Sequence, residues 1–190
     1  MKIKFSPLIE DARGKTGNGV VKKVNGKYIV ASKPTPSSKP RSASQLEVQD
    51  HFTDANDYAD EVQLKPDLLA LYEKAAEASG KSVYQLCRND WFKAPRITRP
   101  DFSEYNGQVG NRILFKVRDV IGASKAIVTL CDEESGELIE KGLAVQEIPG
   151  TSQWIYTATK AVQPGVSVVI NIDAYDYPGN KTHQSGTKPV

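Results

Sequence analysis

The chain has 190 residues, with 39% hydrophobic residues, 25% charged residues and a formal net charge of +2. This length suits one full core, or a β-domain with a smaller helical unit, and excludes two large domains. No apolar run approaches the roughly 20 residues that span a bilayer. Residues 1–7 lack the apolar stretch of a secretory signal, so we expect cytoplasmic synthesis without classical export.

Residues 1–41 are strongly basic, with ten Lys or Arg against two acids. Glycines at 14, 17 and 19 indicate a flexible lead into two β-rich runs, 20–24 and 27–30. The Asn25-Gly26 pair between these runs is typical of a type I′ β-hairpin. An isolated hairpin is marginally stable in water, so we expect it to pack on the chain's own helices or on a neighbouring subunit. The turn predicts four cross-strand pairs: Val24 with Lys27, Lys23 with Tyr28, Lys22 with Ile29 and Val21 with Val30.

The hairpin is followed by a strap, residues 31–41, with prolines at 34, 36 and 40. This composition excludes a helix and favours an extended segment, either a solvated linker or an arm laid along a partner. The acidic surplus of residues 42–94 could neutralise the charge of the arm within the chain. If the arm binds a partner instead, an acidic protein surface is favoured over nucleic acid, because the arm offers one aromatic ring among its basic residues for base stacking. The candidate partner-binding residues are Lys22, Lys23, Lys27, Tyr28, Lys33, Lys39 and Arg41.

Residues 42–94 change to helical periodicity and predict a compact unit of three helices. The second helix is expected to begin at Pro66-Asp67 and to stop at Gly80, and Ser82 is the expected N-cap of a third helix over about 83–93. The first helix is expected over about 42–62, with an apolar face of Ala43, Leu46, Phe52, Ala55, Ala59 and Val62. The apolar face expected for the third helix comprises Val83, Leu86, Cys87 and Trp91.

Residues 94–100, with two prolines, are the predicted boundary before a C-terminal domain of residues 95–190. That domain alternates apolar and polar residues with period two, which predicts an immunoglobulin-like β-sandwich. Two short strands are expected around Leu138 and Leu143, separated by Lys141-Gly142, while residues 181–190 suit either a weak edge strand or a frayed tail. The expected inward-facing sets are Ile113, Phe115 and Val117; Ala126, Val128 and Leu130; Trp154, Tyr156 and Ala158; and Val166, Val168, Ile170 and Ile172.

The fold class expected is therefore α+β in three parts: a basic arm with a β-hairpin and a Pro-rich strap (1–41), a three-helix unit (42–94) and an all-β immunoglobulin-like sandwich (95–190). Two cysteines, Cys87 and Cys131, fall in different parts and are expected to be buried free thiols, without a disulfide or a metal-ligand spacing.

No recognisable catalytic motif is present in the sequence. Gly14-Lys15-Thr16 is similar to the end of a phosphate-binding loop, but Ile9 stands where that motif requires glycine. His51 and His183 fall in different parts and support neither a metal site nor a catalytic triad.

Carboxylates offer two further alternatives, calcium binding and glycoside hydrolysis, at residues 132–134 and at Asp173 with Asp176. The simpler interpretation is that these acids solvate turns and a strand end. We therefore expect no catalytic residue, no cofactor and no metal ligand, and we expect that the protein is not an enzyme.

Several motifs together carry a resemblance to a known group. They are Gly14-Lys15-Thr16-Gly17 with Asn25-Gly26-Lys27, the Pro-rich strap, residues 45–52, the segment from Ser82-Val83-Tyr84 to Asp90-Trp91-Phe92 and Ala94-Pro95, and the closing Asp176-Tyr177-Pro178-Gly179-Asn180. With these motifs the chain resembles a loosely defined group of phage- and prophage-associated proteins of Bacteroidetes-type bacteria with a C-terminal Ig-like domain. The resemblance implies a component of a phage or phage-tail-like particle.

The leading hypothesis is a non-enzymatic assembly protein of such a particle, anchored by its arm to protein subunits, which could include its own copies, and presenting the Ig-like module. The alternatives are a small cargo or effector protein of a contractile injection system, an Ig-like adhesion module, and an enzyme that uses Asp173 and Asp176. The expected location is the virion or a phage-like particle.

Overall fold

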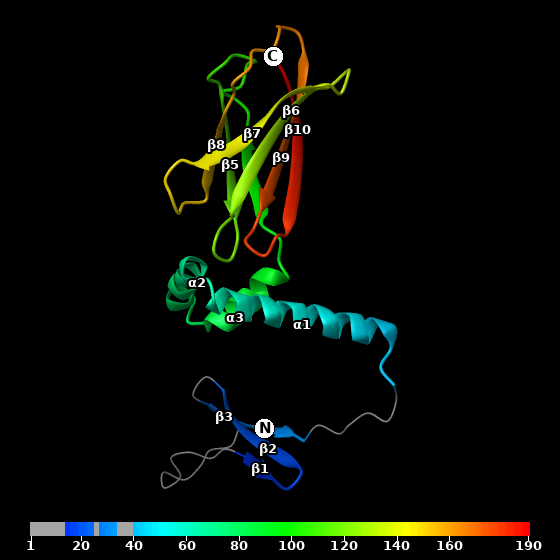
Figure 1. The fold of residues 1–190 in the computed structure, drawn as a ribbon, viewed down its shortest axis with the longest axis vertical. Helices are drawn as coiled ribbons and strands as arrows, with labels where there is room; N and C mark the ends of the chain where they lie inside the picture. Colours follow the sequence, from blue (N-terminus) through cyan, green and yellow to red (C-terminus); the bar gives the residue numbers. More distant parts are fainter. Residues whose placement is uncertain (1–13, 25–26, 34–39) are drawn as a thin grey trace. The chain divides into compact units, whose positions relative to one another are not determined.

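A computed structural model describes residues 14–24, 27–33 and 40–190 of the protein (Figure 1). The chain forms two compact units, Met1–Leu46 and Glu47–Val190. A three-stranded sheet, three helices and a seven-stranded antiparallel sheet are present, which confirms the α+β class. The three-part division of the chain stays a prediction.

The first unit contains an antiparallel sheet of β1 (Gly14–Thr16), β2 (Gly19–Val24) and β3 (Lys27–Ser32), in that order. The four predicted pairs between β2 and β3 are confirmed, from Val24 with Lys27 to Val21 with Val30. Asn25 and Gly26, the predicted turn, lie outside the described residues. The flexible lead expected before the hairpin is wrong, because Gly17, with φ of 54°, and Asn18 form a second two-residue turn that pairs β1 with β2.

Three helices follow: α1 (Ala43–Gln63), α2 (Pro66–Ser79) and α3 (Val83–Trp91). The predicted helix ends are confirmed, because Pro66 opens α2, Gly80 ends it in the left-handed conformation, and the Ser82 hydroxyl accepts a hydrogen bond from the Gln85 amide at 3.2 Å. No helix in the described part of the chain is long and apolar enough to cross a membrane.

The predicted apolar face of α1 is correct only in its C-terminal half. Ala55, Ala59 and Val62 are buried, whereas Ala43, Leu46 and Phe52 are exposed. The helical core comprises residues of α1 beyond position 57 together with residues of α2 and α3, so the apolar side chains of the first turns of α1 stay at the surface. The buried members of this core are Tyr58, Ala59, Val62, Tyr72, Leu86 and Cys87.

The C-terminal strands form one antiparallel sheet in the order β10-β9-β6-β7-β8-β5-β4, nearly closed into a barrel. Strand β7 pairs with β6 along most of its length and with β8 at its end, and the edge strands β4 and β10 approach each other. The strands are β4 (Arg96–Asp101), β5 (Arg112–Arg118), β6 (Lys125–Asp132), β7 (Leu138–Gln146), β8 (Gln153–Thr157), β9 (Ser167–Tyr175) and β10 (Lys181–Pro189).

The inward-facing sets predicted for this domain are confirmed, with Val166 only partly buried. Residues 96–101, which overlap the predicted boundary segment, form β4, and Pro100 is tolerated because it lies beside a bulge in an edge strand, next to Arg99 with φ of 52°. One sequence expectation is wrong. The two short strands near Gly142 are one strand, β7, and a Cβ at Gly142 would lie 2.9 Å from the Tyr156 ring, so glycine here provides room for that ring.

Candidate functional site

The helices meet the barrel at the end where the β5–β6 and β9–β10 connections lie (Figure 1). The Asn180 side-chain amide donates hydrogen bonds to the main-chain carbonyls of Asp90, at 3.3 Å, and Trp91, at 3.1 Å. Val120 and Ile121 from the β5–β6 connection pack against the helical core. This junction therefore has both polar and apolar contacts.

Three carboxyl groups gather at the junction. Asp90 lies near the end of α3, Asp119 directly follows β5, and Asp176 directly follows β9. One oxygen of each lies within 4.8 Å of the others, Asp90 is 0% exposed and Asp176 is 3% exposed. We call these three residues the aspartate cluster.

The oxygens of the aspartate cluster differ in their hydrogen bonds. Asp176 accepts from the main-chain amides of Gly179, at 2.7 Å, and Asn180, at 2.6 Å, and from the Asn180 side chain at 2.7 Å. The Tyr72 hydroxyl donates to Asp90 Oδ2, and the Val120 amide donates to Asp119 Oδ1. Asp90 Oδ1 and Asp119 Oδ2 are buried and have no hydrogen-bond donor.

The cluster holds its carboxyl groups in a poorly solvated environment. Within the described part of the chain, no Lys or Arg side chain forms an ion pair with any of the three. Burial raises the pKa of Asp90 to about 8, and repulsion from Asp119 and Asp176 adds to this shift. Burial raises the pKa of Asp119 to about 6, and repulsion from Asp176 adds to it. Burial also raises the pKa of Asp176. Such a group can share a proton between two carboxyls or hold a cation among three.

Two tyrosines support the cluster from the helical side. The Tyr72 and Tyr58 hydroxyls are 2.9 Å apart, so the buried chain of hydrogen bonds runs from α1 through α2 to Asp90 on α3. Burial raises the pKa of both phenols, and it raises the pKa of the Cys87 thiol to about 11. These groups therefore stay neutral at physiological pH.

A groove of about 730 Å³ lies beside the cluster, between α2 and the end of the barrel. Asp119 lines it, and so does Trp154, whose indole nitrogen is buried without a hydrogen-bond partner. Other lining residues include Leu71, Lys74, Ile121 and Tyr177.

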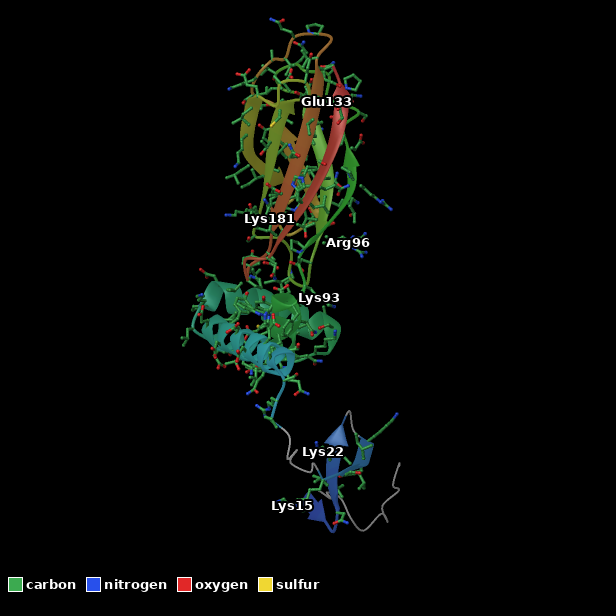
Figure 2. All side chains as sticks on the ribbon, turned by 90° about the vertical axis from the view of Figure 1, so that its right-hand side faces the viewer. Lys15, Lys22, Lys93, Arg96, Glu133 and Lys181 are labelled. Carbon is green, nitrogen blue, oxygen red and sulfur yellow. The ribbon has the colours of Figure 1, made fainter. Side chains whose placement is uncertain are left out.

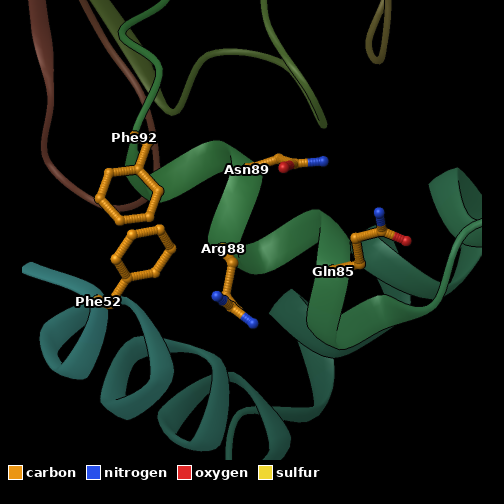
Figure 3. A pocket seen from close by; sticks show the side chains of 5 residues that line it. All are labelled: Phe52, Gln85, Arg88, Asn89 and Phe92. Atoms are coloured by element: carbon orange, nitrogen blue, oxygen red, sulfur yellow. The ribbon is translucent and has the colours of Figure 1, made fainter. Parts of the chain in front are cut away.

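A smaller pocket, of about 200 Å³, lies between α1 and α3 (Figure 3). The Phe52 and Phe92 rings meet edge to face with centroids 4.9 Å apart, and the Arg88 guanidinium lies 5.3 Å from the Phe52 ring. Phe52 and Phe92 are 43% and 45% exposed, and the other lining residues are Gln85, Arg88 and Asn89, so this is an open surface pocket of mixed polarity and not a buried cavity.

The predicted partner-binding residues lie in the first unit. Figure 2 shows Lys22 on β2 and Lys15 on β1 of the small sheet. Lys22, Lys23 and Lys27 are exposed on β2 and β3, while Lys33 and Arg41 lie outside the strands and are also exposed. The structure brings Lys23 and Tyr28 together, with the ammonium 5.4 Å from the ring centroid. Lys39 lies outside the described residues.

The acids singled out from the sequence lie in different environments. Asp173 contacts Lys181 at 3.0 Å and His183 at 2.8 Å. Partial burial alone would raise the pKa of Asp173, but the hydrogen bonds and charges of these two partners hold it below its usual value. Asp176 belongs instead to the aspartate cluster, so the two are not brought to one site. Asp132 accepts main-chain hydrogen bonds from Glu134 and Ser135, as expected of a turn acid.

Cys87 is buried and free as predicted, while Cys131 is free but only partly buried. The sequence interpretation did not identify Asp90 and Asp119 as site residues. A signal for Asp90 was available, because it follows Leu86 by four positions and so lies on the buried face of α3, where a carboxyl group is unusual.

Comparison with known proteins adds a similarity to solved structures. No family model matches the chain, and no curated protein does either. Among solved structures the chain is similar to CopC from Methylosinus trichosporium OB3b, with 12% identity and a TM-score of 0.36, over 49% of this chain and 89% of that chain. A similarity at this level transfers neither fold nor function.

Proposed function

We propose that the seven-stranded barrel is an immunoglobulin-like domain and that the chain is a non-enzymatic assembly protein, attached to its partner through the N-terminal unit. The strand order supports the first part. In the immunoglobulin arrangement one layer has the order A-B-E-D and the other C-F-G. Strands β4-β5-β8-β7 and β6-β9-β10 follow that order, and β7 joins the two layers.

The observation that carries the assembly proposal is that the described part of the small sheet buries no side chain. Among the described side chains of residues 14–46, none is buried, and Ile29 of β3 is 37% exposed. A sheet of this size requires a covered apolar face to be stable. Five exposed lysines on and beside its strands favour an acidic covering surface: Lys15, Lys22, Lys23, Lys27 and Lys33.

A protein partner fits these residues better than nucleic acid. Proteins that bind single-stranded nucleic acid rely on aromatic side chains that stack on the bases. Among the described candidate partner-binding residues, Tyr28 alone has an aromatic ring that could stack on a base, and the Lys23 ammonium lies over this ring. The resemblance to phage-associated proteins makes a subunit of a phage or phage-tail-like particle the partner proposed.

The test is incorporation into particles purified from a producing strain. We expect the combined variant Lys22→Glu, Lys23→Glu and Lys33→Glu to lower the amount of this protein per particle by roughly tenfold or more, because like charges at an interface repel. The matched control carries Lys93→Glu, Lys141→Glu and Lys160→Glu, three exposed positions of the second unit. Equal incorporation of both variants, or absence of the unmodified protein from particles, would contradict the proposal.

A further inference from the structure

The aspartate cluster joins three segments that are distant in sequence. Asp90 comes from α3, Asp119 from the end of β5 and Asp176 from the end of β9. A ligand held by all three would connect the helices to two connections of the barrel. This site is separate from the N-terminal unit and does not depend on what that unit binds.

The cluster contains an unmet requirement for positive charge. Asp90 is fully buried and its Oδ1 has no donor, and one carboxylate oxygen of Asp90 lies within 4.8 Å of an oxygen of Asp119 and one of Asp176. Asp119 Oδ2 is likewise buried without a donor. Burying unpaired carboxylates is strongly unfavourable unless a cation or a proton neutralises them.

We propose that Asp90, Asp119 and Asp176 bind one divalent cation that prefers oxygen ligands, with Ca²⁺ as the best fit. Three carboxylates are hard oxygen donors, which suit Ca²⁺ and Mg²⁺ and not thiolate-preferring metals.

The coordination preferences of the two ions favour Ca²⁺ over Mg²⁺. Ca²⁺ accepts about six to eight oxygen ligands in a flexible geometry, whereas Mg²⁺ requires a near-ideal octahedron and loses its water ligands reluctantly. The cluster offers oxygens from three separate segments, all within 4.8 Å of one another, a spacing that either ion can bridge. Asp119 is only partly buried and lines the groove beside α2, which gives an ion and its remaining water ligands a route to the site.

The bound ion would be structural. It would neutralise the cluster and tie α3 to the β5 and β9 ends, where Asn180 already bonds to the carbonyls of Asp90 and Trp91. This departs from the expectation, drawn from the sequence, that the chain holds no metal. Motif spacing does not reveal such a site, because its ligands come from three separate segments.

The test uses the full chain, stripped with a chelator, dialysed, and unfolded by heat at constant ionic strength with and without CaCl₂. At about a hundredfold excess over the dissociation constant we expect the midpoint temperature to rise by roughly 5–10 °C. Equilibrium dialysis of the same protein should recover one Ca²⁺ per chain, and MgCl₂ should give a smaller rise.

Matched variants separate the cluster from general charge effects. Asp119→Asn keeps the shape of a partly exposed residue and should abolish the rise. Asp173→Asn, which removes an acid paired with Lys181 and His183 outside the cluster, should retain it. Should Asp119→Asn fail to fold, Asp176→Asn serves instead, because its amide oxygen can still accept from the Gly179 and Asn180 main-chain amides, with loss of the bond from the Asn180 side chain.

Three outcomes would overturn the proposal. The first is no Ca²⁺ uptake by the unmodified chain at millimolar CaCl₂, in which case a proton shared by Asp90 and Asp119 accounts for the two oxygens without donors. The second is an equal rise in Asp119→Asn. Terbium luminescence excited through tyrosine gives an independent readout of binding, since the Tyr72 hydroxyl contacts Asp90. The third outcome that contradicts the proposal is the absence of this luminescence.

Discussion

At the scale of single residues, Asp90 predicts an unusual pH dependence of stability in the metal-free protein. It faces Asp119 and Asp176 from the barrel, and Tyr58, Tyr72 and Cys87 from the helices. Burial raises its pKa to about 8, so between the usual Asp range and pH 8 the folded state binds more protons than the unfolded state. Stability therefore falls as pH rises through this window and levels off above it.

We expect the free energy of unfolding to fall by about 2 kcal/mol between pH 6 and pH 8. Urea titrations in the presence of a chelator measure this difference, and Asp90→Asn should flatten the profile because the amide does not titrate. A profile that rises with pH over the same range would be inconsistent with a protonated Asp90.

Gly142 gives a second prediction at this scale. A Cβ there would lie 2.9 Å from Cε2 of Tyr156, a side chain that is 4% exposed. Gly142→Ala should therefore lower the free energy of unfolding by about 1–3 kcal/mol through overpacking. Leu143→Ala, at the next and 65% exposed position, should change it by less than about 0.5 kcal/mol. Chemical denaturation of both variants checks the contrast.

At the scale of helices and strands, local sequence signals predicted the structure correctly where a turn or a helix cap determines the backbone geometry. The Asn25-Gly26 pair predicted the register of β2 with β3, and Ser82 predicted the start of α3. Periodicity did not predict which turns of α1 are covered, because this depends on where α2 and α3 pack. The aspartate cluster was out of reach for the same reason: three segments from positions 90, 119 and 176 meet only through tertiary packing.

The three helices depend on one another through the buried tyrosine pair. Tyr72→Phe removes the hydroxyl that donates to Asp90 Oδ2 and contacts the Tyr58 hydroxyl 2.9 Å away. We expect a loss of about 1–3 kcal/mol, because buried polar partners are left unsatisfied. Thermal unfolding of the variant measures this loss. Tyr84→Phe, at an exposed position of α3, is the control and should change the free energy of unfolding little. Equal losses would show that the hydroxyl chain is not the cause.

At the scale of the whole molecule, both buried cores lie within the second unit. Their buried members run from Tyr58 to Ala174, and none of the described residues before Glu47 belongs to either core. A fragment that begins at Ser42, and so keeps all of α1, should unfold in one transition within about 2 °C of the main transition of the full chain, since its buried apolar area is unchanged.

Differential scanning calorimetry of the fragment and the full chain measures this. A lower midpoint or a loss of cooperativity would mean that residues 1–41 stabilise the helices or the barrel. An unchanged midpoint also strengthens the assembly test, because loss of particle incorporation by an arm variant then reports the missing contact and not an unfolded protein. The helices and the barrel, which meet at the aspartate cluster, would in that case be a body that is stable without residues 1–41.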